Sequence, residues 1–379
     1  MKFIHLSDLH LGKRVNEFSM IGDQTYILGE ILRIVDREAP DAVLIAGDVY
    51  DKPVPSAEAV SLFDDFLTSL SKKDLQVFVI SGNHDSSERL AFGSRLIGKS
   101  GIHLSPAWDG KVGPHVLRDE FGEVNVYMLP FIKPVQVRHF FPDEEIKTYT
   151  DALQVAIREM HMQPEGRNVL MTHQFVTGAE RSESEEISVG GADNVDASVF
   201  DGWDYVALGH LHGPQNAGSE RIRYCGTPLK YSFSEIRHEK SVTVVELKEK
   251  GSLSVRCVPL VPLRDMAEIR GTYEELMRKS FYENTTYEND YMHIILTDEE
   301  DVVEGAAKLR TVYRNFMKLD YDNKRTRHTE AITGTADAET KTPLELFSEL
   351  YEKQNGAPMS EEQEAFVTGL IEKVWEEAE

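Results

Sequence analysis

The chain has 379 residues, of which 41% are hydrophobic, and these values predict a globular protein with two or three domains. No run approaches the roughly 18 apolar residues of a membrane-spanning helix, so no membrane association is expected. The opening residues lack a signal-peptide pattern, and two cysteines are too few for a disulfide framework, so we expect a cytoplasmic protein. A net charge of −24 argues against a free-standing nucleic-acid binder, which usually has a basic face.

The first segment, MKFIHLSDLHLGK, is an apolar run that leads into Asp8 and His10. Residues two apart in an extended strand point to the same side, so these side chains project together if the strand continues that far. Such a pair either binds a metal ion or is a core histidine held by a nearby acid. Two residues leave both interpretations open.

Four further apolar runs end in similar residues: AVLIAGDVYD (42–51), VFVISGNHD (77–85), NVLMTHQ (168–174) and YVALGHLHG (205–213). Runs that are apolar at every position are typical of strands covered on both faces. Amphipathic helical patterns over 27–35 and 62–70 lie between them. We therefore predict an α/β sandwich, in which loops at the carboxyl ends of the strands collect the functional groups.

The strand-end loops would bring together seven metal-ligand side chains: Asp8, His10, Asp48, Asn83, His173, His210 and His212. Oxygen and imidazole donors together favour manganese, iron or zinc over calcium or magnesium. Seven donors exceed the needs of one tetrahedral ion but suit two ions that share a ligand. A carboxylate can bridge two ions, and Asp48 is the natural candidate. Gly47, Gly82 and Gly209 would allow sharp turns beside the ions.

A single histidine beside a strand is usually a core or surface residue, and we interpret His5, His103 and His115 in this way. Chance placement is a poor explanation for the five loops taken together. Asp51 and Asp85 have two possible roles: either they orient the histidines that bind metal, or they cap turns.

The motifs HLSDLHLGK, AGDVYDKPVPS, SGNHDSSERL, MTHQF and ALGHLHGPQ, in this order, resemble the signature of the calcineurin-like metallophosphoesterases. With the later segment YCGTPLKYSFSE, they resemble the SbcD family of DNA-repair nuclease subunits, strongly over residues 1–260. This resemblance implies a four-layer sandwich of two mixed β-sheets flanked by helices. It also implies a small α+β capping domain and a C-terminal helical hairpin.

The resemblance further implies how the donors divide. One ion would be held by Asp8, His10, Asp48 and His212, and the other by Asp48, Asn83, His173 and His210. His84 would contact the scissile phosphate, stabilising the transition state or protonating the leaving oxygen, and Asp85 would set its tautomer. Two ions acidify a bridging water and hold the phosphate for attack.

The second half of the chain contains strand patterns at 222–225, 241–247 and 253–258, which we assign to a second sheet that completes the sandwich. The predicted domains are a nuclease domain over 1–262, a cap over 263–322 with a strand at 291–297 and a helix near 302–313, a linker over 323–341, and a helical hairpin over 342–379. The basic residues of the cap are interleaved with acids, so most are expected to be solvated.

The hairpin has little core of its own, so its apolar face either packs on the cap or binds a partner. The resemblance implies docking on an SbcC-type ABC ATPase, and a homodimer of this chain through helices near 56–70 and 88–98. The predicted partner-binding residues are Leu344, Phe347, Leu350, Tyr351, Phe366, Leu370, Val374 and Trp375.

We therefore predict a manganese-dependent DNA nuclease subunit that acts as a double-strand exonuclease and a single-strand or hairpin endonuclease, located in the cytoplasm on nucleoid DNA. One alternative is a phosphodiesterase or phosphatase for a small-molecule or protein phosphate on the same scaffold. Another is a non-enzymatic scaffold that organises the ATPase, although the complete donor set argues against it.

Overall fold

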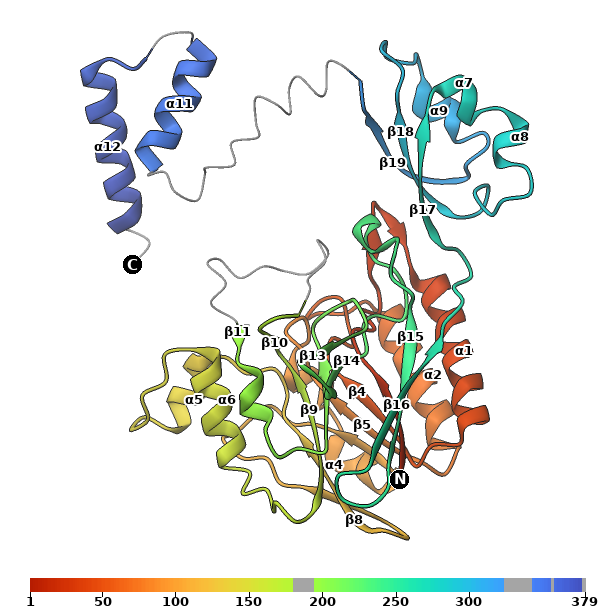
Figure 1. The fold of residues 1–379 in the computed structure, drawn as a ribbon, viewed down its shortest axis with the longest axis vertical. Helices are drawn as coiled ribbons and strands as arrows, with labels where there is room; N and C mark the ends of the chain where they lie inside the picture. The colour runs from red at the N-terminus through yellow and green to blue at the C-terminus, as the bar shows by residue number, and fades with distance from the viewer. Residues whose placement is uncertain (180–193, 324–342, 356–357, 377–379) are drawn as a thin grey trace. The chain divides into compact units, whose positions relative to one another are not determined.

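The computed structural model describes residues 1–179, 194–323, 343–355 and 358–376 (Figure 1). The chain divides into two compact units. The first unit comprises Met1–Arg270, Glu274–Ile295 and Glu304–Asp320, and the second comprises Gly271–Tyr273, Leu296–Val303 and Tyr321–Glu379. Apart from Asn323, the predicted linker lies outside the described residues.

A six-stranded mixed sheet of the first unit consists of β1 (Lys2–Leu6), β4 (Ala42–Ala46), β5 (Gln76–Ile80), β6 (Ile102–Leu104), β15 (Ser241–Leu247) and β16 (Leu253–Pro259). Its strand order is β16-β15-β1-β4-β5-β6. The strands β1, β4, β5 and β6 are parallel, whereas β15 pairs antiparallel with both β1 and β16. The prediction that 241–258 belongs to the second sheet is therefore wrong, because β15 finds its hydrogen-bonding partner in the N-terminal strand.

The second six-stranded sheet consists of β7 (His115–Asp119), β8 (Gly122–Met128), β9 (Arg167–His173), β12 (Tyr205–Gly209), β13 (Gln215–Ala217) and β14 (Ser219–Tyr224). Its order is β13-β14-β12-β9-β8-β7, with β8, β9, β12 and β14 parallel. Two-stranded pairs are formed by β2 (Arg14–Val15) with β3 (Phe18–Ser19) and by β10 (Phe175–Val176) with β11 (Asn194–Val195).

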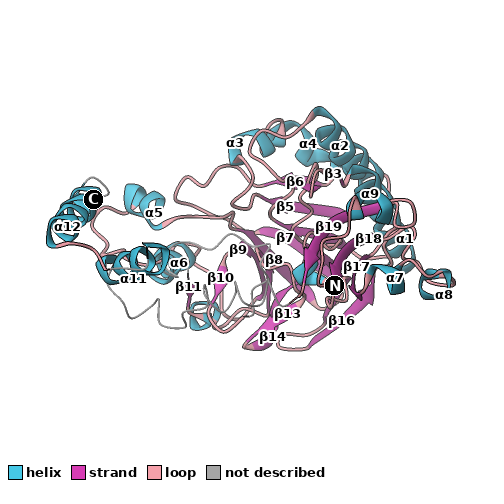
Figure 2. Cartoon of the chain, turned by 90° about the horizontal axis from the view of Figure 1, so that it is seen from above, coloured by secondary structure: helices cyan, strands magenta, loops and turns pink. Residues whose placement is uncertain are grey.

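The two large sheets pack face to face, and helices cover their outer faces (Figures 1 and 2). Between the sheets, Phe3, Phe78 and Val169 belong to one fully buried apolar cluster. The first sheet is covered by α1 (Ile21–Glu38) and α2 (Ala57–Ser71), and the second by α5 (Pro134–Phe140) and α6 (Tyr149–Arg158). The predicted four-layer sandwich is confirmed.

Local sequence signals explain the helix boundaries. Ser56 caps α2 by accepting a hydrogen bond from the Ala59 N–H, and Thr148 and Asp151 form a capping box that begins α6. Between β5 and β6 the chain forms three short helices, α3 (Ser87–Leu90), α4 (Ser94–Ile97) and η1 (Gly98–Ser100). Two further short helices are η3 (Ala197–Phe200) and η4 (Phe233–Glu235).

A three-stranded sheet follows the sandwich, in the order β17 (Met266–Gly271), β18 (Tyr291–Leu296) and β19 (Asn315–Tyr321). Its short helices are α7 (Tyr273–Leu276), α8 (Lys279–Tyr282) and α9 (Gly305–Leu309). The predicted strand at 291–297 is present, and the helix predicted near 302–313 is shorter than expected.

Contacts within the first unit join α1 to Tyr291 of the small sheet and to Arg264, which precedes that sheet. The Asp23 carboxylate is fully buried and accepts hydrogen bonds from the Arg264 guanidinium, at 3.0 and 2.6 Å, and from the Tyr291 hydroxyl, at 2.7 Å. A paired buried carboxylate of this kind fixes the orientation of the groups that it joins, because breaking the pair would leave a buried charge unsatisfied.

The second unit contains the two predicted C-terminal helices, α11 (Pro343–Asn355) and α12 (Glu361–Glu376). Ser360 and Gln363 exchange hydrogen bonds at the start of α12, and the Gln363 amide donates to the Tyr351 hydroxyl at 3.0 Å. Among the described residues, no helix is both long and apolar enough to cross a membrane.

Candidate metal centre

The predicted donors lie at the carboxyl ends of strands in both large sheets. Asp8 and His10 follow β1, Asp48 follows β4, and Asn83 follows β5. From the second sheet, His173 ends β9, while His210 and His212 follow β12. Because the sheets pack face to face with these ends at the same edge, residues far apart in the chain come together; the His210 N–H, for example, donates to both oxygens of Asp8, at 3.0 and 3.2 Å.

The backbone is strained at four of the seven donor positions. Asp8, His10 and Asp48 have φ values of 53°, 45° and 49°, and His210 has a φ of 104°. Residues with side chains rarely adopt this left-handed region, and such outliers concentrate at functional sites. The strand does not continue to Asp8 and His10, because β1 ends at Leu6, so the expectation that they share one side of an extended strand does not apply. The left-handed backbone conformations of the two residues place their side chains instead.

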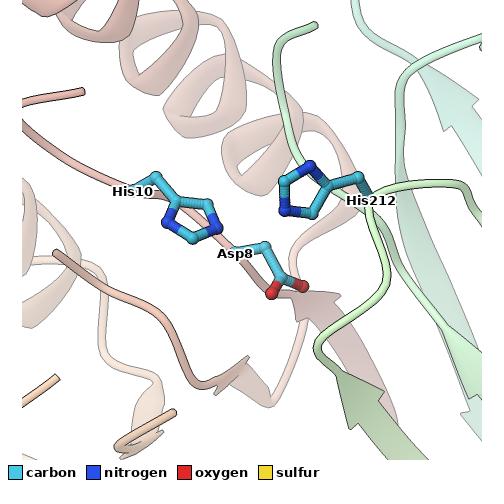
Figure 3. Close-up of side chains that lie close together, drawn as sticks. All are labelled: Asp8, His10 and His212. Carbon is cyan, nitrogen blue, oxygen red and sulfur yellow. The ribbon is translucent and has the colours of Figure 1, made fainter. Parts of the chain in front are cut away.

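One group of donors consists of Asp8, His10 and His212, whose ligand atoms lie within 4.8 Å of one another (Figure 3). All three are buried, and neither ring nitrogen of His10 has a hydrogen-bond partner among the described residues. Burial holds the pKa of His10 well below its usual range, so the imidazole is neutral. A neutral, buried imidazole without hydrogen bonds, next to a carboxylate, has the chemistry of a metal ligand.

A second group is centred on His173. Its ligand atom lies within 4.8 Å of those of Asp8 and Asp48, and the Asn83 Oδ1 lies 3.0 Å from both the His173 Nε2 and the His210 Nδ1. The Oδ2 of Asp48 is 3.2 Å from the His173 Nε2 and 3.7 Å from the His10 Nε2. One carboxylate oxygen therefore faces a histidine of each group.

Two glycines make this close approach possible. A Cβ atom on Gly82 would lie 2.1 Å from the Oδ1 of Asp48, and one on Gly209 would lie 1.8 Å from the carbonyl oxygen of Ala46. Neither contact is tolerable, so any side chain at these positions would separate the loops that carry the donors.

The electrostatics of the site favour a cation. Burial and the nearby Asp48 charge raise the pKa of Asp8 to about 6, although His173 opposes this shift. Burial alone would raise the pKa of Asp48, but His173 outweighs it by charge and hydrogen bonding and holds that pKa well below its usual range. Buried carboxylates this close together need positive charge, and divalent ions would supply it. The residues present therefore fit a metal centre.

His84 is half-buried beside the first group, and its ligand atom lies within 4.8 Å of those of His10 and Asp48. Its backbone N–H donates to the Oδ1 of Asp48 at 2.9 Å, and its Nδ1 lies 3.2 Å from the backbone carbonyl of Asp51. A carbonyl oxygen can only accept a hydrogen bond, so Nδ1 donates its N–H to it, and in the neutral ring the lone pair is on Nε2.

Asp85 and Asp51, for which the sequence leaves two roles open, have different kinds of contact. The Asp85 carboxylate accepts hydrogen bonds from the backbone N–H groups of Val49, Tyr50 and Gly82, at 3.1, 2.9 and 3.0 Å. It therefore joins the Asp48 and His84 loops, and the orienting contact to the His84 ring comes from the Asp51 carbonyl instead. The Asp51 carboxylate pairs with Lys13 at 2.8 Å and lies 3.9 Å from the His10 Nδ1.

Sequence reasoning missed a group of residues that support the donors from behind. The Gln24 amide donates to the His10 carbonyl at 2.8 Å, and the Tyr231 hydroxyl donates to the Leu9 carbonyl at 2.6 Å. Glu235 contacts the His212 Nδ1 at 3.0 Å. The segment SFSE contains Glu235, but nothing in its pattern indicates which histidine it meets.

Comparisons with known proteins define the class. Residues 1–214 of the 379 match the calcineurin-like phosphoesterase family, and residues 262–355 match the type 5 capsule protein repressor C-terminal domain. The chain is therefore a calcineurin-like phosphoesterase, and so a hydrolase.

Relatives narrow this class. Two proteins named as the SbcD subunit of the nuclease SbcCD, from Staphylococcus epidermidis and Staphylococcus saprophyticus, are each 33% identical to this chain over 323 residues. The match covers 84% of this chain and 85% and 84% of the two relatives. The chain belongs to the SbcD family of nuclease subunits.

Similar solved structures include a dimetal phosphatase from Danio rerio, with a TM-score of 0.40, 11% identity and coverage of 69% of this chain and 96% of that one. The protein TT1561 of Thermus thermophilus has a TM-score of 0.38 and 13% identity, and the match covers 68% of this chain and 98% of that one.

Proposed function

We propose that this chain is the nuclease subunit of a DNA-processing complex and hydrolyses phosphodiester bonds with two divalent ions, most favourably Mn²⁺. It would degrade double-stranded ends as an exonuclease and cut single strands and hairpins as an endonuclease, in repair, recombination and replication. The observation that carries this proposal is the position of the Asp48 Oδ2, between a histidine of each donor group. The names of the two relatives support a nuclease that acts as one subunit of a complex.

Asp8, His10, Asp48 and His212 would hold one ion, and Asp48, Asn83, His173 and His210 the other. Both donor groups mix imidazole nitrogen with carboxylate or amide oxygen, which suits Mn²⁺ better than Mg²⁺. When bound, the ions supply an acidified water and neutralise phosphate charge.

His84 would act on the substrate itself. With the Nδ1 proton directed to the Asp51 carbonyl, its Nε2 is the ring nitrogen that would meet a phosphate at the metal centre. A protonated ring would stabilise the charge that develops on the phosphate or donate its proton to the leaving oxygen. Asp85 would contribute by holding the two loops in register rather than by touching the ring.

The hairpin of α11 and α12 would bind an ABC-type ATPase of the SbcC kind. Its large apolar side chains are exposed, and Phe366, Leu350 and Leu370 have exposed fractions of 68%, 53% and 47%. Leu344 and Tyr351 are partly buried, Phe347 is 43% exposed, and the side chains of Val374 and Trp375 fall outside the described residues.

The ATPase partner would also provide much of the DNA binding. The net charge is −24, and basic residues such as Arg264 and Arg278 are engaged in ion pairs with Asp23 and Glu274. Two copies of this chain and two ATPase subunits would form a heterotetramer, which would act in the cytoplasm on nucleoid DNA. Exposed Phe92 and Leu96, at 88% and 83%, support a homodimer contact near α3 and α4.

A cleavage assay tests the proposal. The purified chain, with Mn²⁺, would be given hairpin DNA, linear duplex DNA and a cyclic nucleotide in parallel, with EDTA as the metal-free control. We expect Mn²⁺-dependent cutting of DNA that exceeds any hydrolysis of the cyclic nucleotide. Efficient cyclic nucleotide hydrolysis with intact DNA would contradict a nuclease function and favour a small-molecule phosphodiesterase.

A further inference from the structure

A buried ion pair lies directly behind one of the donor histidines. Glu235, in the turn η4, is fully buried, and its Oε1 is 3.0 Å from the His212 Nδ1. Its other oxygen, Oε2, is 2.6 Å from the Lys240 Nζ. The Lys240 side chain is itself only 4% exposed.

Lys240 also forms several hydrogen bonds. Its Nζ donates to the His212 carbonyl at 2.9 Å and to the Thr227 Oγ1 at 2.7 Å, in addition to Glu235. The pair therefore holds His212 at two points: Glu235 binds the ring, and Lys240 binds the backbone of the same residue.

Stability alone is a weak explanation for this arrangement. Two charges taken out of water lose hydration, and a buried pair is often no more stabilising than apolar side chains of the same volume. Geometry offers a better explanation, because a carboxylate that accepts the Nδ1–H of an imidazole fixes both its tautomer and its ring orientation.

We infer that Glu235 and Lys240 form a positioning pair that presents the Nε2 lone pair of His212 to the ion held with Asp8 and His10. The pair touches neither substrate nor reacting atoms; it acts through His212. Lys240 keeps the Glu235 carboxylate aimed at the ring, since the Lys240 ammonium and the His212 imidazole each contact one of its oxygens. This inference rests on the proposed two-ion function and adds to it two residues that the donor motifs do not contain.

The experiment measures metal binding by isothermal titration of the full chain with Mn²⁺. The main variant is Glu235→Gln combined with Lys240→Met, because removing both charges leaves no lone buried ion. Glu235→Gln alone is the second variant, in case the double variant does not fold. Asp204→Asn is the control, because Asp204 is also buried and paired, at 2.7 Å with Lys250, but belongs to the opposite end of β12.

We expect the control to bind two ions with the same affinities as wild type. The double variant should bind one of the two ions about 10- to 100-fold more weakly. Excess Mn²⁺ should restore DNA cleavage by the variant, because His212 is still present; a purely structural role would not produce such a rescue. A folded variant with wild-type affinity at both sites would overturn the inference. Wild type that binds no Mn²⁺ would instead overturn the proposed function.

Discussion

The donor loops and the C-terminal hairpin place their chemically important side chains in opposite environments. Asp8 and His173 are fully buried and His10 is 1% exposed, each supported by backbone or side-chain contacts within the first unit. In the hairpin, Phe366 is 68% exposed and Leu350 is 53% exposed. The first region completes its own structure, whereas the second presents an apolar face that a partner can cover. Catalysis and assembly should therefore be separable by mutation.

The strongest test of this separation is Asp48→Ala. Because the Asp48 Oδ2 lies between His10 and His173, its loss should weaken both donor groups and reduce cleavage to background. Cleavage of hairpin DNA and Mn²⁺ stoichiometry measure the two effects, and co-purification with the ATPase should be unchanged. Cleavage at the wild-type rate would remove the basis for a metal centre at this position.

His84→Ala should separate metal binding from catalysis within the donor loops. Both ions should still bind, because His84 is outside the two proposed ligand sets, but cleavage should fall by about 10²- to 10⁴-fold. Isothermal titration with Mn²⁺, followed by a cleavage assay on the same sample, measures both quantities. If the variant loses an ion, His84 is a ligand, as its position near His10 and Asp48 permits.

Phe366→Asp should weaken binding to the ATPase but leave cleavage intact. A charge on the exposed face of α12 should weaken binding to the ATPase by about 30-fold or more, since an aromatic anchor of an interface contributes about 2 kcal/mol. Mn²⁺-dependent cleavage of single-stranded DNA by the isolated chain should remain. Glu364→Lys, on an exposed position of the same helix, is the matched control. Equal binding of the ATPase by Phe366→Asp and wild type would show that Phe366 is not part of the partner surface.

The smallest expected effect concerns the pH dependence of the metal-free core. Burial lowers the pKa of His5 to about 3 from 6.5. Between these values the unfolded chain binds a proton that the folded chain does not, so the free energy of unfolding decreases as pH falls, by about 1.4 kcal/mol per pH unit from this residue.

Chemical denaturation of wild type and His5→Gln at pH 7 and pH 5, both in EDTA, isolates this contribution. Asp8 and Asp85, whose pKa values burial raises to about 6, titrate in both proteins, so their opposite contribution cancels in the comparison. The variant should lose less stability on acidification than wild type. Parallel curves would mean that His5 takes up a proton without unfolding.

Much of the metal centre follows from local sequence. Short, fully apolar runs such as AVLIA predict strands covered on both faces, and donors immediately after such runs must meet where parallel strands end. Asp48, Asn83 and His173 are predictable for this reason, and so is an α/β sandwich; its four layers are implied only by the family resemblance. The exposed stripe of the hairpin is predictable as well, because its helices have capping signals and too few apolar residues for a core.

Other features depend on partners distant in sequence, which periodicity cannot reveal. The hairpin of β15 and β16 joins β1 rather than β14 because the free edge of the N-terminal strand can accept its hydrogen bonds. Asp85 binds three backbone N–H groups, His84 takes its orientation from the Asp51 carbonyl, and Glu235 reaches His212 across 23 residues. Local patterns identify which residue types stand at the strand ends; the packing of two sheets decides which atoms each of them touches, because hydrogen bonds form only between groups that tertiary contacts bring within about 3 Å.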